Sequence, residues 1–328
     1  MVRVEIRYVR GPHVLLAGCL ALACCLSPAR ASGAPASSRQ SLDDVWFTGP
    51  MLANSAATLP RGHWLVEPYL YDARSAHADG YGSLTYMLYG LTDRLTAGLI
   101  PVFGYNRVDG GPDSSGIGVG DISMLAQYRL FAPPAASPLP TVSIQLEETL
   151  PTGTYDRLGN RAADGLGSGA HVTTLAINTQ TWFWLANGRI LRMRFNVSRT
   201  FAGRAGVDDV SVYGTAPGFH GHALPGDTFA VDAALEYSLT REWALAFDLT
   251  WSRSGNTRVR GRGVPDAATA QPIDVRLDSG SSEAFGFAPA VEYNWNAHLG
   301  LLCGVRVITG GHHTPITATP AVALNVVY

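Results

Sequence analysis

Apolar and polar side chains alternate strictly along several segments of this chain. The clearest segment spans residues 243–253. Its odd positions are large and apolar, namely Trp243, Leu245, Phe247, Leu249 and Trp251. Its even positions are small or polar, namely Ala244, Ala246, Asp248, Thr250 and Ser252. Successive side chains of a β-strand point to opposite faces, so this pattern predicts a strand with one lipid-facing side and aromatic residues at both membrane interfaces.

The same alternation recurs in three other segments, 229–238, 191–198 and 142–147. Extending the parity test along the chain predicts twelve strands, at about 62–72, 81–89, 95–105, 119–131, 140–150, 170–184, 189–200, 227–238, 242–253, 283–293, 298–308 and 316–328. The even number is typical of single-chain bacterial barrels. We therefore predict an all-β fold, a transmembrane antiparallel up-and-down β-barrel; the alternative is a soluble β-sandwich, whose strands would be shorter.

The connections between these strands alternate in length. Five are short: 90–94, 132–139, 185–188, 239–241 and 294–297. Four are long and rich in Gly, Asp, Ser and Pro: 106–118, 151–169, 201–226 and 254–282. This order is typical of outer-membrane barrels, which have short periplasmic turns and long external loops. The two remaining connections, 73–80 and 309–315, are short but fall on the external side.

Composition agrees with a membrane environment. The chain is 46% hydrophobic and only 15% charged, with a mean hydropathy of +0.07. After the N-terminal region no run approaches the roughly 18 apolar residues of a membrane helix, which leaves a closed barrel as the spanning structure. The net charge of -2 gives no basic field for nucleic acid, so nucleic acid is not an expected partner.

The N-terminus reads as a secretory signal peptide. Arg3, Arg7 and Arg10 precede an apolar run over 14–26, and Ala29-Arg30-Ala31 supplies a small-x-small cleavage site. We predict a signal peptide over 1–31, removed on export to the outer membrane. Two alternatives are a buried N-terminal helix and a lipoprotein signal ending at Cys19. Cleavage after Ala31 would leave Cys303 as the one thiol, facing lipid, with no intramolecular disulfide.

Two further regions flank the predicted strands. Residues 32–61 are expected either to be disordered in the periplasm or to form a partial plug, and Trp46, Phe47 and Met51 favour docking. The barrel itself is predicted over 62–328. Its last strand ends in Tyr328, which resembles the C-terminal signal recognised by the barrel assembly machinery. The expected partners are thus that machinery and outer-membrane lipid.

Three short motifs carry a resemblance to a known family. They are Gly118-Val119-Gly120-Asp121, Leu150-Pro151-Thr152-Gly153 and the glycine-rich stretch 165–169. Together they resemble the outer-membrane family of the meta-pathway of phenol degradation, whose members are often called transporters. The resemblance implies a barrel more firmly than it implies a solute. It does not extend to 201–226 or 254–282, where no family pattern is present. Read physically, the glycines supply turns or kinks, and Asp121 binds local backbone amides.

Charged residues of both signs fall on the lumen-facing parity. They are Glu67, Asp121, Arg129, Glu147, Arg192, Arg194, Asp232, Glu236, Asp248, Glu292 and Arg306. One hypothesis is a narrow pore with a mixed-charge wall. The other is that Arg192 and Arg194 pair with Asp232 and Glu236 on the adjacent strand, so that charge ladders fill the barrel. The sequence leaves both open.

Three function classes follow from this. The first is a passive channel or transporter for small, aromatic or hydrophobic solutes, without a cofactor. The second is a structural or surface-interaction barrel. The third, an outer-membrane hydrolase, finds only a weak match in His77-Ala78-Asp79-Gly80, which lacks a nearby serine, so no catalytic residue is predicted. His220, His222, His312 and His313 lie on glycine-rich loops without a third spaced ligand, and no metal site is predicted.

Overall fold

The computed structural model describes residues 39–134, 137, 139–264 and 272–328. The signal-peptide prediction for 1–31, including Cys19, lies outside the described residues, as does the start of the segment 32–61. Two short 3-10 turns are present, η1 (Leu42–Asp44) and η2 (Ala162–Asp164). Among the described residues, no helix has the length and hydropathy required to cross a membrane.

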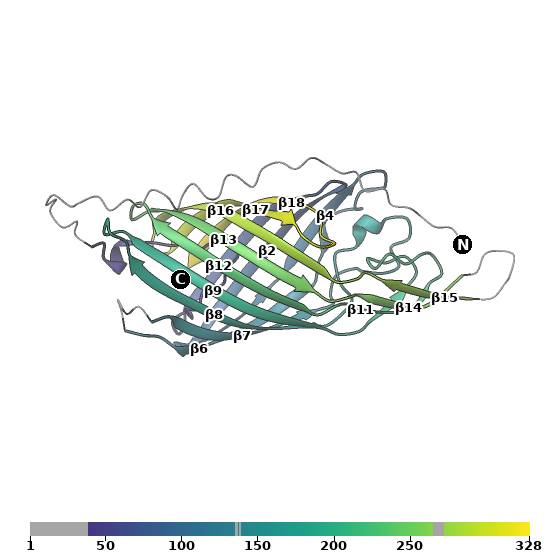
Figure 1. Cartoon of the computed structure of the whole chain (residues 1–328), viewed down its shortest axis with the longest axis horizontal. Helices are drawn as coiled ribbons and strands as arrows, with labels where there is room; N and C mark the ends of the chain where they lie inside the picture. Colours follow the sequence, from purple (N-terminus) through teal and green to yellow (C-terminus); the bar gives the residue numbers. More distant parts are fainter. Residues whose placement is uncertain (1–38, 135–136, 138, 265–271) are drawn as a thin grey trace. The chain divides into compact units, whose positions relative to one another are not determined.

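A closed antiparallel sheet forms the body of the molecule (Figure 1). Its strands are β1 (Trp64–Arg74), β2 (Ala78–Thr92), β3 (Leu95–Ile100), β4 (Val102–Val108), β5 (Gly118–Val119), β6 (Ile122–Phe131), β7 (Thr141–Leu150), β8 (Val172–Trp184), β9 (Ile190–Ala202), β12 (Thr228–Ser238), β13 (Trp243–Ser254), β16 (Ser282–Asn296), β17 (Leu299–Gly310) and β18 (Thr317–Val327). The ring closes because β1 pairs with both β2 and β18.

The prediction of a twelve-stranded barrel is confirmed. Two predicted strands, 95–105 and 119–131, are each interrupted, and the pieces β3 with β4 and β5 with β6 serve as single spans. The first interruption is at Pro101, which has no N–H to donate to the sheet. The second is at Gly120 and Asp121, because the Gly120 carbonyl and the Asp121 carboxylate accept hydrogen bonds from residues of another loop.

The two faces of the wall differ as the alternation requires. On β13, Phe247 and Leu249 are 38% and 55% exposed, whereas Ala246 and Asp248 are 4% and 0% exposed. Cys303 is also exposed, on the outward parity of β17. Aromatic pairs mark the end with the short connections, with ring centroids 4.5 Å apart for Trp64 and Tyr89 and 4.7 Å for Trp243 and Tyr293. We call this the short-turn end, and the opposite one the long-loop end.

The long loops 201–226 and 254–282 contain a second sheet that the sequence analysis did not identify. Its strands are β10 (Ala205–Asp208), β11 (His220–Leu224), β14 (Arg258–Gly263) and β15 (Ile273–Asp278). It extends past the long-loop end of the barrel (Figure 1). One face buries Val207, Phe219, Ala223 and Val259 together. The period-two alternation of apolar and polar residues was present in β15, but in too short a segment to distinguish it from a loop.

Candidate functional site

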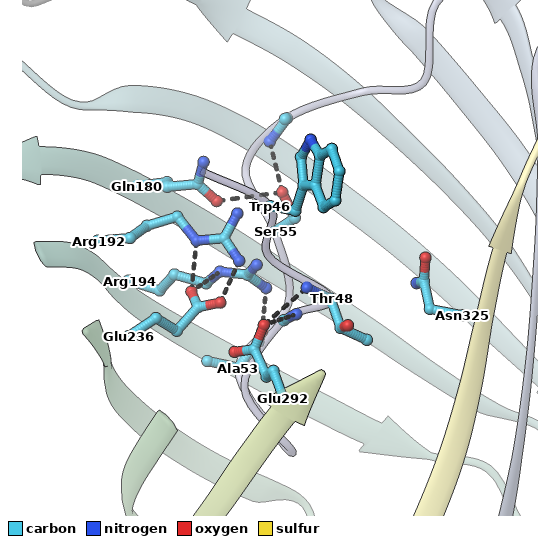
Figure 2. Close-up of polar contacts among 12 residues, drawn as sticks. Trp46, Thr48, Ala53, Ser55, Gln180, Arg192, Arg194, Glu236, Glu292 and Asn325 are labelled. Carbon is cyan, nitrogen blue, oxygen red and sulfur yellow. Dashed lines mark hydrogen bonds and ion pairs between the residues drawn. The ribbon is translucent and has the colours of Figure 1, made fainter. Parts of the chain in front are cut away.

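The segment 39–61 enters the barrel, and its middle part, from Phe47 to Leu59, contacts the lumen wall. The backbone N–H of Trp46 donates to the carbonyl of Arg241 at the short-turn end. The chain then rises to Met51–Asn54 and returns, so that Thr58 donates to the carbonyl of Asp93, again at the short-turn end. Gly62 donates to Gly90 just before β1 begins. The segment is therefore a loop inserted into the lumen from one end, and we call it the inserted segment (Figure 2).

Glu292 on β16 holds the ascending part of the inserted segment. Its Oε2 accepts hydrogen bonds from the backbone N–H of Thr48 at 2.6 Å and of Gly49 at 3.2 Å. Gly49 has φ +133°, which a residue with a side chain rarely adopts. This backbone conformation aims two successive amides at one carboxyl group.

Asp248 on β13 holds the apex of the inserted segment in the same way. Its Oδ2 accepts from Met51 N–H at 3.0 Å, and its Oδ1 accepts from Ala53 at 2.9 Å and Leu52 at 3.3 Å. Asp248 and Glu292 are both fully buried. Main-chain amides thus donate hydrogen bonds to both of these lumen carboxylates.

Two arginines of β9 share one glutamate of β12. Arg192 donates to Glu236 through Nε at 2.5 Å and also through Nη2, while Arg194 Nε lies 3.2 Å from Glu236 Oε2. The pairing follows from the sheet register, which sets Glu236 opposite Arg192. Asp232 instead lies opposite Asn196, and within the described chain it forms no ion pair. Ladder pairing therefore involves Glu236 but not Asp232.

The arginines also contact the inserted segment. Arg194 Nη1 donates to the Ala53 carbonyl at 2.7 Å. The guanidinium of Arg192 lies 4.5 Å from the ring centroid of Phe47 and 5.2 Å from that of Trp182 on β8. These distances are in the range of cation–π attraction. The cluster of Arg192, Arg194 and Glu236 therefore joins the wall to the segment (Figure 2).

Small residues beside the charges make room for the inserted segment. The lumen face of β12, β13 and β16 carries five buried alanines: Ala234, Ala244, Ala246, Ala288 and Ala290. Uncharged amides of β6 and β9 also bind the segment. Gln127 donates to the carbonyls of Ser55 and Ala57, and Asn196 donates to Asn54. These amides were not predicted as site residues, although their positions on the lumen-facing parity indicated that they face the interior of the barrel.

The other predicted lumen residues are more dispersed. Glu67 accepts from Asn325 at 3.0 Å, and Glu147 Oε2 lies 3.4 Å from its neighbour Gln145. Arg129 is half-buried on the lumen parity of β6. Asp232 and Arg306 lie beyond the apex of the inserted segment, towards the long-loop end. That these residues line a functional pore stays a prediction.

The inserted segment leaves two cavities. The first, of about 270 Å³, lies between it and the wall formed by β1, β2, β3, β6 and β18. Its apolar lining includes Met51, Tyr69, Tyr86 and Leu125, and its polar lining includes Glu67, Gln127, Arg192 and Arg194. The second, of about 250 Å³, contains Asn54, Asn178, Asp232 and Arg306 on its surface. Both cavities therefore have mixed linings, and the first offers aromatic and aliphatic side chains beside charged groups.

The motif residues gather at the long-loop end. Asp121 accepts from the backbone N–H groups of Gly153 at 2.9 Å and Ser168 at 2.7 Å. These amides belong to another loop, so the prediction that Asp121 binds local amides is wrong. Its placement in the lumen by parity is also wrong, because the side chain makes this long-range contact instead. Thr152 donates to the Gly120 carbonyl at 2.9 Å.

Close backbone packing explains the glycines of these motifs. A Cβ on Gly153 would lie 2.8 Å from the Cα of Gly167 and 3.0 Å from the carbonyl carbon of Gly120. A Cβ on Gly118 would lie 2.6 Å from a methyl of Leu166. Leu150 ends β7, and Pro151 begins the loop. Nearby, Tyr213 donates to the Ser168 carbonyl, and burial raises the pKa of Tyr213 to about 12, which keeps it protonated as a donor. The three motifs thus form one structural cluster.

The histidines considered for metal binding are separated into pairs. His220 Nδ1 lies 2.9 Å from Asp208 Oδ1, and the rings of His312 and His313 are 3.9 Å apart. Over the described ranges, no group of three or more His, Cys, Asp or Glu is placed to hold a metal ion.

Comparisons with known proteins agree with this architecture. The structure is similar to the crystal structure of an outer membrane channel from Pseudomonas putida F1, with a TM-score of 0.63, 16% identity, and coverage of 85% of this chain and 100% of that chain. Weaker matches are the β domain of the Bordetella autotransporter BrkA, with a TM-score of 0.47, 9% identity and coverage of 82% and 100%, and the CymD monoaromatic hydrocarbon channel, with a TM-score of 0.41, 11% identity and coverage of 82% and 88%. No curated protein sequence matches the chain.

A family model matches residues 49–307, which include all three motifs, the inserted segment from Gly49 onward and most of the barrel. The resemblance drawn from the motifs is confirmed by this match. The chain is an outer-membrane-type β-barrel and belongs to the family described as "Putative MetA-pathway of phenol degradation".

Proposed function

We propose that this protein is a passive outer-membrane channel for small, single-ring or similarly apolar solutes, with the inserted segment as a plug that narrows the lumen. The observation that carries the proposal is the first cavity, which lies between the segment and the wall. Its volume of about 270 Å³ exceeds the ~150 Å³ of an apolar cavity known to bind benzene. The family's description, which refers to phenol degradation, supports an aromatic solute. The proposal assigns no enzymatic activity.

The proposal also covers export and orientation. The signal peptide would be cleaved near Ala31, and the strand ending at Tyr328 would present the C-terminal residue to the assembly machinery. Short connections suit the periplasmic side and long loops the exterior. The short-turn end, where the plug enters, is thus assigned to the periplasm.

Filling the first cavity tests the solute pathway. Leu125 lines this cavity and is 7% exposed, so Leu125→Trp should reduce the entry of phenol and benzoate into proteoliposomes by about tenfold, because the larger ring occupies the space. Liposome swelling against protein-free vesicles measures the flux. Leu146→Trp on the adjacent strand is the matched control, since Leu146 is 48% exposed on the lipid face. Equal flux through both variants, or none through the wild type, would reject the proposal.

Cysteine labelling tests the orientation. In a Cys303→Ser background, Val212→Cys and Ile273→Cys should react with an impermeant maleimide on intact cells, because both side chains are exposed in the long loops. Leu139→Cys, exposed in the 132–139 turn, should react only after the outer membrane is permeabilised. The reverse pattern would show that the orientation in the membrane is inverted, with the long loops in the periplasm.

The folded external sheet favours a second candidate function, a surface-interaction barrel. Loops that are only connections do not require a buried cluster such as Val207, Phe219, Ala223 and Val259. In that case the barrel would be an anchor, and no solute would enter liposomes even when the plug is loosened.

A further inference from the structure

A row of four side chains crosses the outer face of the barrel at the long-loop end. The sheet register sets Phe229 of β12 between Arg199 of β9 and Arg253 of β13, and sets Arg253 opposite Glu283 of β16. All four stand on the parity of the lipid-facing residues. Phe229 and Trp251 form an edge-on pair with centroids 6.0 Å apart. Aromatic rings beside arginines are typical of the boundary between hydrocarbon and headgroups.

A hollow of about 410 Å³ lies above this row, where the barrel meets the external sheet. Its charged lining consists of Arg199, Arg253, Arg258 and Asp227. Its apolar lining includes Phe229, Leu224 and Pro225. The hollow therefore combines three cations with an apolar floor.

The arginines of the hollow are incompletely paired. Arg199 Nη2 lies 3.1 Å from Asp227, which leaves its other donors available. Arg253 Nε is 3.7 Å from Glu283, beyond hydrogen-bond distance, and the Arg253 side chain is 61% exposed. Asp278 faces Arg258 across the strands, but it is bound by both oxygens to Arg260 at 3.0 and 2.9 Å. Within the part of the chain that is described, Arg258 has no ion pair.

We propose that this hollow binds the phosphate group of an anionic lipid headgroup in the outer leaflet. Guanidinium groups match phosphate oxygens with paired donors, and three of them converge on one space. The apolar floor would accommodate the first part of an acyl chain below the headgroup. The placement in the outer leaflet rests on the orientation given under the proposed function.

Lipid binding to the full-length protein tests this inference. Native mass spectrometry in detergent would compare lipid A carrying two phosphates with the same lipid after removal of both. The wild type should bind the phosphorylated form about tenfold more tightly, because charge-assisted hydrogen bonds are lost without the phosphates. Arg253→Gln with Arg258→Gln should remove that preference. Equal binding of both lipids by the wild type would overturn the proposal.

Two controls keep the result specific. Arg107→Gln removes an outer-face arginine from another part of the long-loop end, where Asp79 and Asp113 surround it, and should leave binding unchanged; an equal loss in this variant would overturn the proposal. Arg258→Gln alone breaks no ion pair of the described chain. This variant should lose lipid binding severalfold while the barrel stays folded, as shown by its heat-dependent shift in gel mobility.

Inorganic phosphate distinguishes the lipid from the free ion. Millimolar phosphate should leave the phosphorylated lipid bound, because phosphate alone lacks the apolar contacts. Displacement of the lipid at that concentration would show a site for free phosphate and contradict the lipid assignment. Absence of solute flux in liposomes would reject the channel proposal without affecting this measurement, and inverted cysteine labelling would separately reject the leaflet.

Discussion

Asp248→Asn combined with Glu292→Gln is expected to raise the single-channel conductance severalfold. In the wild type these two carboxylates accept five backbone hydrogen bonds from Thr48, Gly49 and Met51–Ala53. An amide side chain has an NH2 donor in place of one carboxyl oxygen, so buried backbone N–H groups would face donors and lose their acceptor, at about 1–3 kcal/mol for each unsatisfied group. This loss is enough to shift the plug from a closed to an open population. Planar-bilayer recording measures the change.

Glu67→Gln is the control for this double variant. Glu67 is also a lumen carboxylate, but among the described residues it accepts its hydrogen bond from Asn325 on the wall and not from the inserted segment. Because Glu67 lines the first cavity but does not hold the plug, Glu67→Gln should change the conductance far less than the double variant does. A cysteine in place of Ala53, which is 3% exposed, should become reactive only with the double variant. Unchanged conductance together with an unreactive cysteine would show that these carboxylates do not hold the plug.

Glu236→Gln is expected to lower the free energy of unfolding by about 3–5 kcal/mol, the usual effect of removing one member of a buried ion pair. Glu236 has 0% side-chain exposure, and its two partners Arg192 and Arg194 have 9% and 6%. Without the carboxylate, two neighbouring guanidinium groups would remain buried side by side. Urea unfolding in detergent, followed by the heat-dependent gel shift, measures the loss.

Asp232→Asn provides the comparison for Glu236→Gln. Asp232 lies on the same strand and the same face, opposite Asn196 and outside the arginine pairs. We expect the free energy of unfolding of this variant to stay within about 0.5 kcal/mol of the wild type. A similar loss in both variants would mean that any lumen carboxylate of β12 stabilises the barrel, and that the arginine pairing has no special role.

The family motifs illustrate how much a short pattern can predict. Gly118, Gly120 and Gly153 mark places where the backbone must pass closely, which the residue type alone indicates. The identity of the approaching segment depends on the fold. Gly153 packs against Gly167, and Asp121 reaches the amides of Gly153 and Ser168 from about thirty and nearly fifty residues away. A motif therefore predicts crowding at a glycine, but it does not identify the partner.

By itself, the sequence determined the number of barrel spans, their approximate ends and the face of most of their side chains. These properties are local, because a period of two residues places every second side chain in lipid wherever the strand lies. Tertiary structure decided the pairings. Glu236 meets Arg192 through the register of β9 and β12, and a shift of the register by one residue would turn every side chain of one strand to the other face. The place of the inserted segment was also decided by tertiary structure, because Asp248 and Glu292 bind it through backbone amides, which nearly every residue carries and which therefore leave no pattern in the sequence.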